Sequence, residues 1–379
     1  MNPNRKRSLS KTQIEFGEYE VSKLFSEVTL GQIKLKNKVV MAPMTRSRSI
    51  GNIPGDLVAE YYEQRSEAGL IITEGTSPSP NGLGYARIPG IFSKEQIAGW
   101  KKVTERVHAK GSKIFIQLMH TGRIGHPANL PEGAVMLAPS AVLAKGQMWT
   151  DKEGMKDHPT PKEMTTAEIH AARDEYVQAS KNAMEAGFDG VELHAANGYL
   201  MEQFLHPSSN KRTDEYGGSI EKRIKFVTET AAAVASAIGK DKVGIRLSPY
   251  GAFNDLGPHE DTHEEYSLLA EKLNEIGIVY IHLVDHSSMG APKVEPATVK
   301  KIREAFKRTL ILSGGYDRAR AEADLDSGAA DLIAFGKPFL SNPDLVTKLE
   351  KGLPLAPLDQ TTLYTADAKG YTDYPFTQH

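Results

Sequence analysis

Three side chains that can donate a hydrogen bond or a proton lie close together in the sequence: His194, Asn197 and Tyr199. They follow residues 188–193 (FDGVEL), a short run whose apolar and β-branched residues predict a buried strand. Parallel α/β folds build their active sites just past the carboxyl ends of such strands. An imidazole and an amide can both donate to one oxygen, and a phenol can deliver a proton. The segment therefore predicts a site that polarises a carbonyl or nitro group and protonates the neighbouring carbon.

Two further polar side chains, Gln117 and Arg246, lie in other predicted strands. A glutamine at the mouth of a barrel offers a donor and an acceptor, which suits the edge of a pyrimidine ring. An arginine inside an apolar strand must be paired, because an unpaired buried charge is too costly. Its partner is either Glu192 on the adjacent predicted strand or an anion that forms on a bound cofactor, and the sequence leaves both interpretations open.

The first predicted strand ends at Pro43, followed by Met44 and Thr45. Proline cannot donate in a strand ladder, so pairing ends there and the backbone turns outward. The exposed amides and the Thr45 hydroxyl are then free to face a planar heterocycle. An ordinary boundary between strand and loop explains the same residues.

The last two predicted strands end in glycine-containing loops, SGGY at 313–316 and FGKP at 335–338. These loops form the usual phosphate site of a barrel, where glycine lets backbone N–H groups approach the oxygens and a helix N-terminus adds its positive dipole end. Lys337 adds a positive charge. We therefore expect phosphate binding at these two loops, with plain turns as the alternative.

The elements that must position these residues alternate between short apolar runs and amphipathic helical stretches. Eight runs read as strands: 39–43, 70–74, 113–118, 190–194, 243–247, 279–284, 309–313 and 331–335. Helices are predicted at 94–109, 166–186, 219–238, 262–276 and 295–306. Eight strands that alternate with helices predict an α/β fold, a (β/α)₈ TIM barrel. The strand ends that carry the polar residues then meet at one mouth.

Two segments fall outside this alternation. Residues 28–35 read as a β-hairpin that turns at Gly31-Gln32 and plugs the lower end of the barrel. Residues 119–161, between the third strand and the third helix, form a long loop rich in proline and glycine, which predicts a lid or a wall of the substrate pocket.

Composition narrows the class of protein. The chain has 379 residues, a formal net charge of −2 and no cysteine, which excludes disulfides, thiolate metal sites and a cysteine nucleophile. Neither nucleic acid nor an anionic membrane is an expected partner, and His120, His126, His194 and His206 lack metal-ligand spacing. The polar amino-terminal tail (1–22) has no signal-peptide core, so we expect a cytoplasmic protein whose single domain spans 23–379.

The chain resembles the Old Yellow Enzyme family, and the resemblance runs from about Leu24 to Pro375. It rests on APMTRSR at 42–48, HAANGYL at 194–200, NKRTDEYGGS at 210–219 and GIRLSP at 244–249. NPDL at 342–345 and GYTDYP at 370–375 agree with it. The last motif is similar to the bacterial N-ethylmaleimide and nitrate-ester reductase branch.

The resemblance implies an FMN-dependent reductase of activated C=C bonds that uses NADPH or NADH. It implies that tightly bound FMN is contacted by Pro43, Met44, Thr45, Gly75, Gln117, Arg246, Gly314, Gly315, Gly336 and Lys337. His194 and Asn197 would bind the activating oxygen of the substrate, and Tyr199 would protonate the α-carbon while flavin N5 gives a hydride to the β-carbon. Electron-poor alkenes (enones, enals and maleimides, with nitroalkenes or nitrate esters as further candidates) and phenolic ligands are the implied partners of a monomer or homodimer.

Three features depart from the family pattern. Met119 stands where relatives often carry tryptophan, so the way in which substrates lie over the flavin is open. Lys337 replaces the more usual arginine, which loses a bidentate phosphate contact but keeps the charge. The segment before GYTDYP lacks the usual glycine-rich run, although Tyr364 is still expected to reach the substrate pocket.

Two other functions compete with this one. The first is a flavin-free barrel with a phosphate site that acts as an isomerase or lyase, which needs a Schiff-base lysine or a carboxylate base at a strand end. The second is a protein that binds flavin or phenols without catalysis, which leaves Tyr199 without a role.

Overall fold

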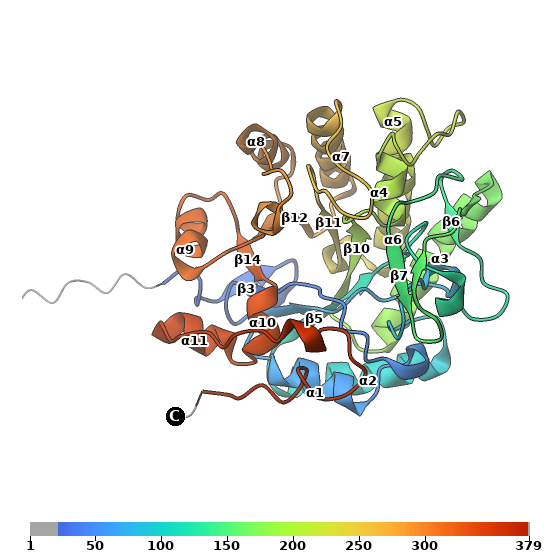
Figure 1. Ribbon diagram of the computed structural model, residues 1–379. Helices are drawn as coiled ribbons and strands as arrows, with labels where there is room; N and C mark the ends of the chain where they lie inside the picture. Colours follow the sequence, from blue (N-terminus) through green and yellow to red (C-terminus); the bar gives the residue numbers. More distant parts are fainter. Residues whose placement is uncertain (1–21, 378–379) are drawn as a thin grey trace, which may run out of the picture.

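The computed structural model describes residues 22–377, and its centre is a closed barrel of eight parallel strands (Figure 1). The barrel strands are β3 (Val39–Met41), β4 (Leu70–Ile72), β5 (Lys113–Leu118), β10 (Gly190–Ala195), β11 (Val243–Leu247), β12 (Tyr280–Val284), β13 (Thr309–Ser313) and β14 (Leu332–Phe335). All eight predicted strands are confirmed, and so is the (β/α)₈ barrel. The first strand is shorter than predicted because Pro43 has no N–H group to donate to the ladder.

Helices surround the barrel on its outer side (Figure 1). The longer ones are α1 (Asp56–Gln64), α2 (Lys94–Ala109), α3 (Thr166–Glu185), α6 (Lys225–Ile238), α7 (Thr262–Ile276), α8 (Pro296–Ala305), α9 (Arg318–Asp326) and α11 (Leu345–Lys351). Shorter ones are α4 (Leu200–Leu205), α5 (Ile220–Arg223) and α10 (Lys337–Ser341). Serine and threonine caps start α2 and α3, where Ser93 and Thr165 form capping boxes with Gln96 and Glu168.

The prediction of a single helix over 219–238 is wrong, because the segment forms two helices. It is split at Ile224, where ψ is −11°, into α5 and α6, and Ser219 makes no side-chain cap. The guanidinium of Arg223, the last residue of α5, is held by Asp261 and Glu265 on the neighbouring α7 segment. These tertiary contacts hold the end of α5 against the α7 segment, next to the break.

The lower part of the barrel interior is apolar and closed by a hairpin. Strands β1 (Val28–Leu30) and β2 (Ile33–Leu35) pair antiparallel, as predicted. Leu30 and Leu35 belong to one buried apolar cluster with residues of the barrel strands, among them Val40, Leu70, Phe115, Tyr280, Ile311 and Leu332. The hairpin therefore plugs the amino-terminal end, and only the carboxyl end is left open for a site.

The long loop over 119–161 has secondary structure of its own. It contains β6 (Leu137–Ala138), which pairs with β9 (Lys162–Glu163), and the antiparallel hairpin of β7 (Gln147–Thr150) and β8 (Gly154–Asp157). Residues of this hairpin line the central cavity, so the loop supplies a pocket wall as expected. The remaining short elements are 3₁₀ turns at Ile50–Asn52, Pro80–Gly82, Pro127–Asn129, Lys240–Lys242, Ser287–Met289 and Gln360–Thr362.

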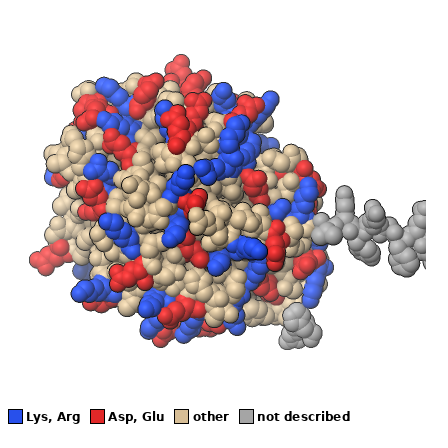
Figure 2. Space-filling model, turned by 180° about the vertical axis from the view of Figure 1, so that it is seen from behind, with Lys and Arg blue, Asp and Glu red and all other residues tan. Residues whose placement is uncertain are grey.

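The surface carries both charges. On the face shown in Figure 2, lysine and arginine are interspersed with aspartate and glutamate, in keeping with the net charge of −2. Across residues 22–377, no helix combines the length and hydropathy needed to cross a membrane. The predicted polar tail over 1–22 lies almost entirely outside the described residues, and the single domain over 23–379 stays a prediction.

The plug yields a test of stability. Replacing Leu35 with alanine removes most of a side chain that is 1% exposed. We therefore expect the free energy of unfolding to fall by about 2–4 kcal/mol. Thr29, exposed on the same hairpin, is the matched control, and its alanine variant should stay within about 0.5 kcal/mol of wild type. Denaturant unfolding measures both, and equal stability of the two variants would show that the hairpin does not seal the barrel.

Candidate active site

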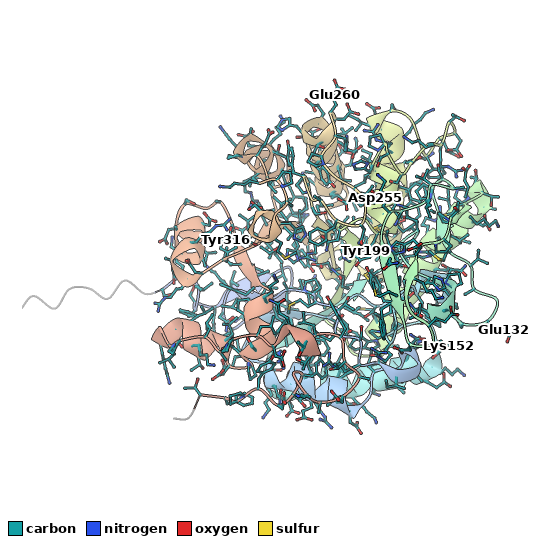
Figure 3. All side chains as sticks on the ribbon, in the orientation of Figure 1. Glu132, Lys152, Tyr199, Asp255, Glu260 and Tyr316 are labelled. Atoms are coloured by element: carbon teal, nitrogen blue, oxygen red, sulfur yellow. The ribbon has the colours of Figure 1, made fainter. Side chains whose placement is uncertain are left out.

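A cavity of about 1040 Å³ opens at the carboxyl ends of the barrel strands. All of the residues that the sequence singled out contribute to its walls: Pro43, Met44, Thr45, Gly75, Gln117, Met119, His194, Asn197, Tyr199, Arg246, Gly314, Gly315, Gly336, Lys337 and Tyr364. Tyr199 lies near the centre of the view in Figure 3, whereas Glu132 and Glu260 lie at the edge of the molecule. The strand ends thus bring these residues together, although their individual roles stay predictions.

Glu192, one of the two partners that the sequence left open for Arg246, is engaged by other side chains. The carboxylate of Glu192 accepts from Gln117 Nε2 at 2.9 Å and from the Tyr280 hydroxyl at 3.0 Å, and it lies 2.9 Å from His282 Nδ1. No ion pair joins it to Arg246 in the described part of the chain, where Arg246 Nε has no hydrogen-bond partner. Arg246 is nevertheless buried, and burial lowers its pKa while the Glu192 charge opposes that shift.

The same network orients Gln117. Its Nε2 donates to Glu192, so its carbonyl oxygen remains available on the cavity side. Behind it, His282 bridges Glu192 and the Ser313 hydroxyl, which lies 3.0 Å from His282 Nε2. The upper layer of the barrel interior is therefore polar and connected, and it presents an arginine and an amide oxygen to the cavity.

His194 is neutral at physiological pH. Its side chain is 3% exposed, and burial, together with the charge of Arg246, holds its pKa well below the usual value. A neutral imidazole carries one N–H donor. The His194 ring meets the Tyr199 ring edge to face, with centroids 4.9 Å apart.

Tyr199 has a hydroxyl partner that the sequence did not reveal. The Tyr85 and Tyr199 hydroxyls lie 2.8 Å apart at the wall of the cavity. Burial raises the pKa of Tyr199, so its phenol stays protonated at neutral pH. Tyr85 comes from the loop between β4 and α2, which no strand pattern connects to the site.

Asn197 has a backbone conformation that is uncommon outside glycine, with φ of 59°, in the left-handed region that asparagine tolerates best. Its N–H donates to Ser248 Oγ at 2.9 Å, and its carbonyl accepts from Asn254 Nδ2 at 2.7 Å. Its side-chain oxygen lies against His286. The sequence interpretation missed Ser248, Asn254 and His286, although Ser248 and His286 also follow strand ends.

Beneath this loop lies a buried carboxyl group. Glu202 accepts from Gly198 N–H, from Ser248 Oγ at 2.9 Å and from the Tyr266 hydroxyl at 2.8 Å. Burial raises its pKa to about 7. Glu202 thereby supports both the turn after β10 and the serine that holds Asn197.

Glycine is required at position 314, where a side chain would meet the neighbouring backbone. A Cβ at Gly314, where φ is 117°, would lie 1.9 Å from the Asp285 carbonyl oxygen, and one at Gly75 would lie 2.5 Å from Met119 Sδ. Gly336 directly precedes Lys337, the first residue of α10. Arg320, which the sequence did not single out, donates to the Gly314 carbonyl oxygen at 2.8 Å and adds positive charge beside this loop.

Met119 and Tyr364 lie at opposite depths of the cavity. Met119 is 1% exposed and packs with Leu83, Ile88 and Tyr199. Tyr364 is 60% exposed, and its carbonyl oxygen accepts from Arg87 Nη2 at 2.7 Å, which ties the carboxy-terminal segment to the mouth.

Comparisons with known proteins agree with this geometry. Residues 23–356 match the model of the NADH:flavin oxidoreductase / NADH oxidase family. The chain is 42% identical to 12-oxophytodienoate reductase 1 of Oryza sativa subsp. japonica, over 94% of this chain and 93% of the relative.

Two solved structures superpose closely. Morphinone reductase in complex with tetrahydroNAD has a TM-score of 0.89 at 42% identity, over 94% of this chain and 98% of that one. The Old Yellow Enzyme homologue of Zymomonas mobilis has a TM-score of 0.89 at 38% identity, over 93% and 99%. The chain belongs to the NADH:flavin oxidoreductase / NADH oxidase family, the Old Yellow Enzyme family, and is an FMN-dependent oxidoreductase.

Proposed function

We propose that the protein uses NADPH or NADH to reduce carbon–carbon double bonds that are conjugated to an electron-withdrawing group, as in enones, enals and maleimides. The observation that carries the proposal is the convergence of His194, Asn197 and Tyr199 on the cavity that also holds buried Arg246. The names of 12-oxophytodienoate reductase and morphinone reductase describe reductases of oxo compounds, which supports this substrate class.

The walls of the cavity fit FMN. Within residues 22–377, Arg246 Nε and the Gln117 side-chain oxygen have no hydrogen-bond partner, so both suit the polar edge of the isoalloxazine. Pro43, Met44, Thr45 and Gly75 line the cavity with them. Gly314, Gly315, Gly336 and Lys337 would hold the phosphate through backbone N–H groups and one ammonium charge. When bound, FMN supplies a hydride to the β-carbon of the alkene.

His194 and Asn197 bind the electron-withdrawing oxygen of the substrate. Negative charge develops on that oxygen as the β-carbon is reduced, so two donors aimed at it stabilise the transition state more than the ground state. His194 acts as a neutral donor because its pKa is held low. Met119 and Tyr364 complete the substrate side of the cavity.

Tyr199 donates its phenolic proton to the α-carbon. Its raised pKa keeps the proton in place until the carbon becomes basic, and the Tyr85 hydroxyl at 2.8 Å offers a path for reprotonation.

Each of the two competing functions leaves an observation unexplained. A flavin-free isomerase or lyase leaves the family membership unexplained, and a non-catalytic binding protein leaves the Tyr85–Tyr199 pair without a role. The cytoplasmic location, the monomer or homodimer, the reduction of nitroalkenes or nitrate esters and the resemblance to the maleimide and nitrate-ester reductase branch stay predictions.

Replacing Tyr199 with phenylalanine removes the proton donor but keeps the ring that packs on His194. We expect reduction of the flavin by NADPH to keep its rate within about threefold, because no proton from Tyr199 enters that step, and reoxidation by cyclohexenone to slow by roughly 10²-fold or more. Anaerobic stopped-flow measurements separate the two half-reactions.

The matched control is Tyr85→Phe, which leaves the Tyr199 hydroxyl in place and should slow reoxidation less. Reoxidation at the wild-type rate in Tyr199→Phe would assign the proton to another group.

His194→Ala tests the donor and its protonation state. We expect phenols, which mimic the enolate, to bind about tenfold more weakly in the variant. Because burial and Arg246 depress the pKa of His194, the imidazole stays neutral and this loss should be equal at every pH between about 5 and 8. Optical titration measures it, and a loss that grows toward acidic pH would show that His194 acts as a cation.

A further inference from the structure

His286 lines the cavity, but the proposed reaction assigns it no role. It follows β12, is 8% exposed and lines the same cavity as His194 and Tyr199. Its Nε2 lies 2.6 Å from Asn197 Oδ1, a short contact between a buried imidazole and a half-buried amide that come from different strand ends.

The contact decides which end of the Asn197 amide meets a ligand. Because Oδ1 points to His286, Nδ2 is the end left to donate toward the cavity. The reverse orientation would present an acceptor to the substrate oxygen and repel it. An amide has no intrinsic preference between the two orientations, so its neighbour must select one.

The protonation state of His286 is compatible with this selection. Burial and the charge of Arg246 lower the pKa of His286 to about 3, with a further contribution from His282 and opposition from Asp285. The imidazole is therefore neutral, with one N–H and one acceptor nitrogen. Only the tautomer with its hydrogen on Nε2 can donate to Asn197 Oδ1.

Among the residues that the structure describes, the other hydrogen bonds of Asn197 involve its backbone and not its side chain. Ser248 and Asn254 bond its N–H and its carbonyl oxygen. His286 itself is fixed by its ring, which packs on Phe253 with centroids 4.5 Å apart, and by its carbonyl oxygen, which accepts from Met289 N–H at 2.8 Å. A fixed imidazole thus faces an amide whose backbone is already locked.

We propose that His286 is a positioning residue that holds the Asn197 amide with its nitrogen toward the substrate oxygen. The inference rests on the proposed function, since it assigns a cause to the donor geometry of that site. It adds a residue from the loop after β12 to an oxygen-binding site otherwise built after β10.

Two variants of His286 separate the hydrogen bond from the packing. His286→Phe keeps a ring against Phe253 but has no donor, and His286→Gln places an amide nitrogen at the same number of bonds from Cβ as Nε2. With the FMN-loaded protein and 4-cyanophenol as the probe, we expect the dissociation constant to rise about tenfold in the phenylalanine variant and less than about threefold in the glutamine variant. The flavin spectrum of the ligand-free variants, unchanged from wild type, controls for folding.

The same titration in an Asn197→Ala background tests whether His286 acts through Asn197. We expect His286→Phe to change the dissociation constant there by less than about twofold, because the group that it positions is gone. A second tenfold loss would mean that His286 contacts the ligand directly and would overturn the inference. So would tight binding by His286→Phe alone, whereas FMN-loaded wild-type protein that fails to bind the phenol would contradict the proposed function as well.

Discussion

The buried positive charge of Arg246 is the constraint on which the site depends. It lies inside a closed barrel, where an unbalanced charge is costly, yet the carboxylate of Glu192 is used by Gln117, Tyr280 and His282. Glu192 balances the charge electrostatically without a direct ion pair. Arg246 can therefore stabilise negative charge that develops in the cavity.

The barrel separates this polar layer from an apolar one. Near the strand starts, the interior is filled with aliphatic and aromatic side chains and is sealed by the β1–β2 hairpin. Near the strand ends, it holds the network of Gln117, Glu192, His282 and Ser313. The polar groups that the proposed reaction uses thus lie at one end of the barrel, and the other end is closed by apolar packing.

The proposed oxygen-binding donors are supported by groups buried beneath the loop that carries them. Asn197 is held by Ser248, which is held in turn by Glu202, a carboxyl group buried beneath the loop. Donors fixed before the reaction begins need no reorganisation as charge develops, which is the condition for strong electrostatic stabilisation.

Much of this was accessible from the sequence, for a physical reason. Strand periodicity predicted the eight strands, and the convergence of strand ends in a barrel then placed Gln117, His194 and Arg246 at one mouth. The partner of Arg246 could not be predicted, because it depends on register. Glu192 lies beside Gln117 and Gly244, whereas Arg246 lies two residues further along the strands, beside His194 and His282.

Residues supplied by irregular segments were missed. Tyr85 and Asn254 come from loops with no strand or helix periodicity, and the role of His286 depends on a contact across two strand ends. The break at Ile224 was missed because tertiary contacts of Arg223, rather than a local breaker residue, accompany it.

We infer that this cavity holds a flavin that passes electrons from a nicotinamide nucleotide to an activated alkene. The most direct measurement is the visible spectrum of the purified protein under anaerobic conditions, first with NADPH and then with cyclohexenone. We expect a flavin spectrum that NADPH bleaches and cyclohexenone restores. A protein without flavin absorbance, or a bleached flavin that the enone leaves reduced, would contradict it.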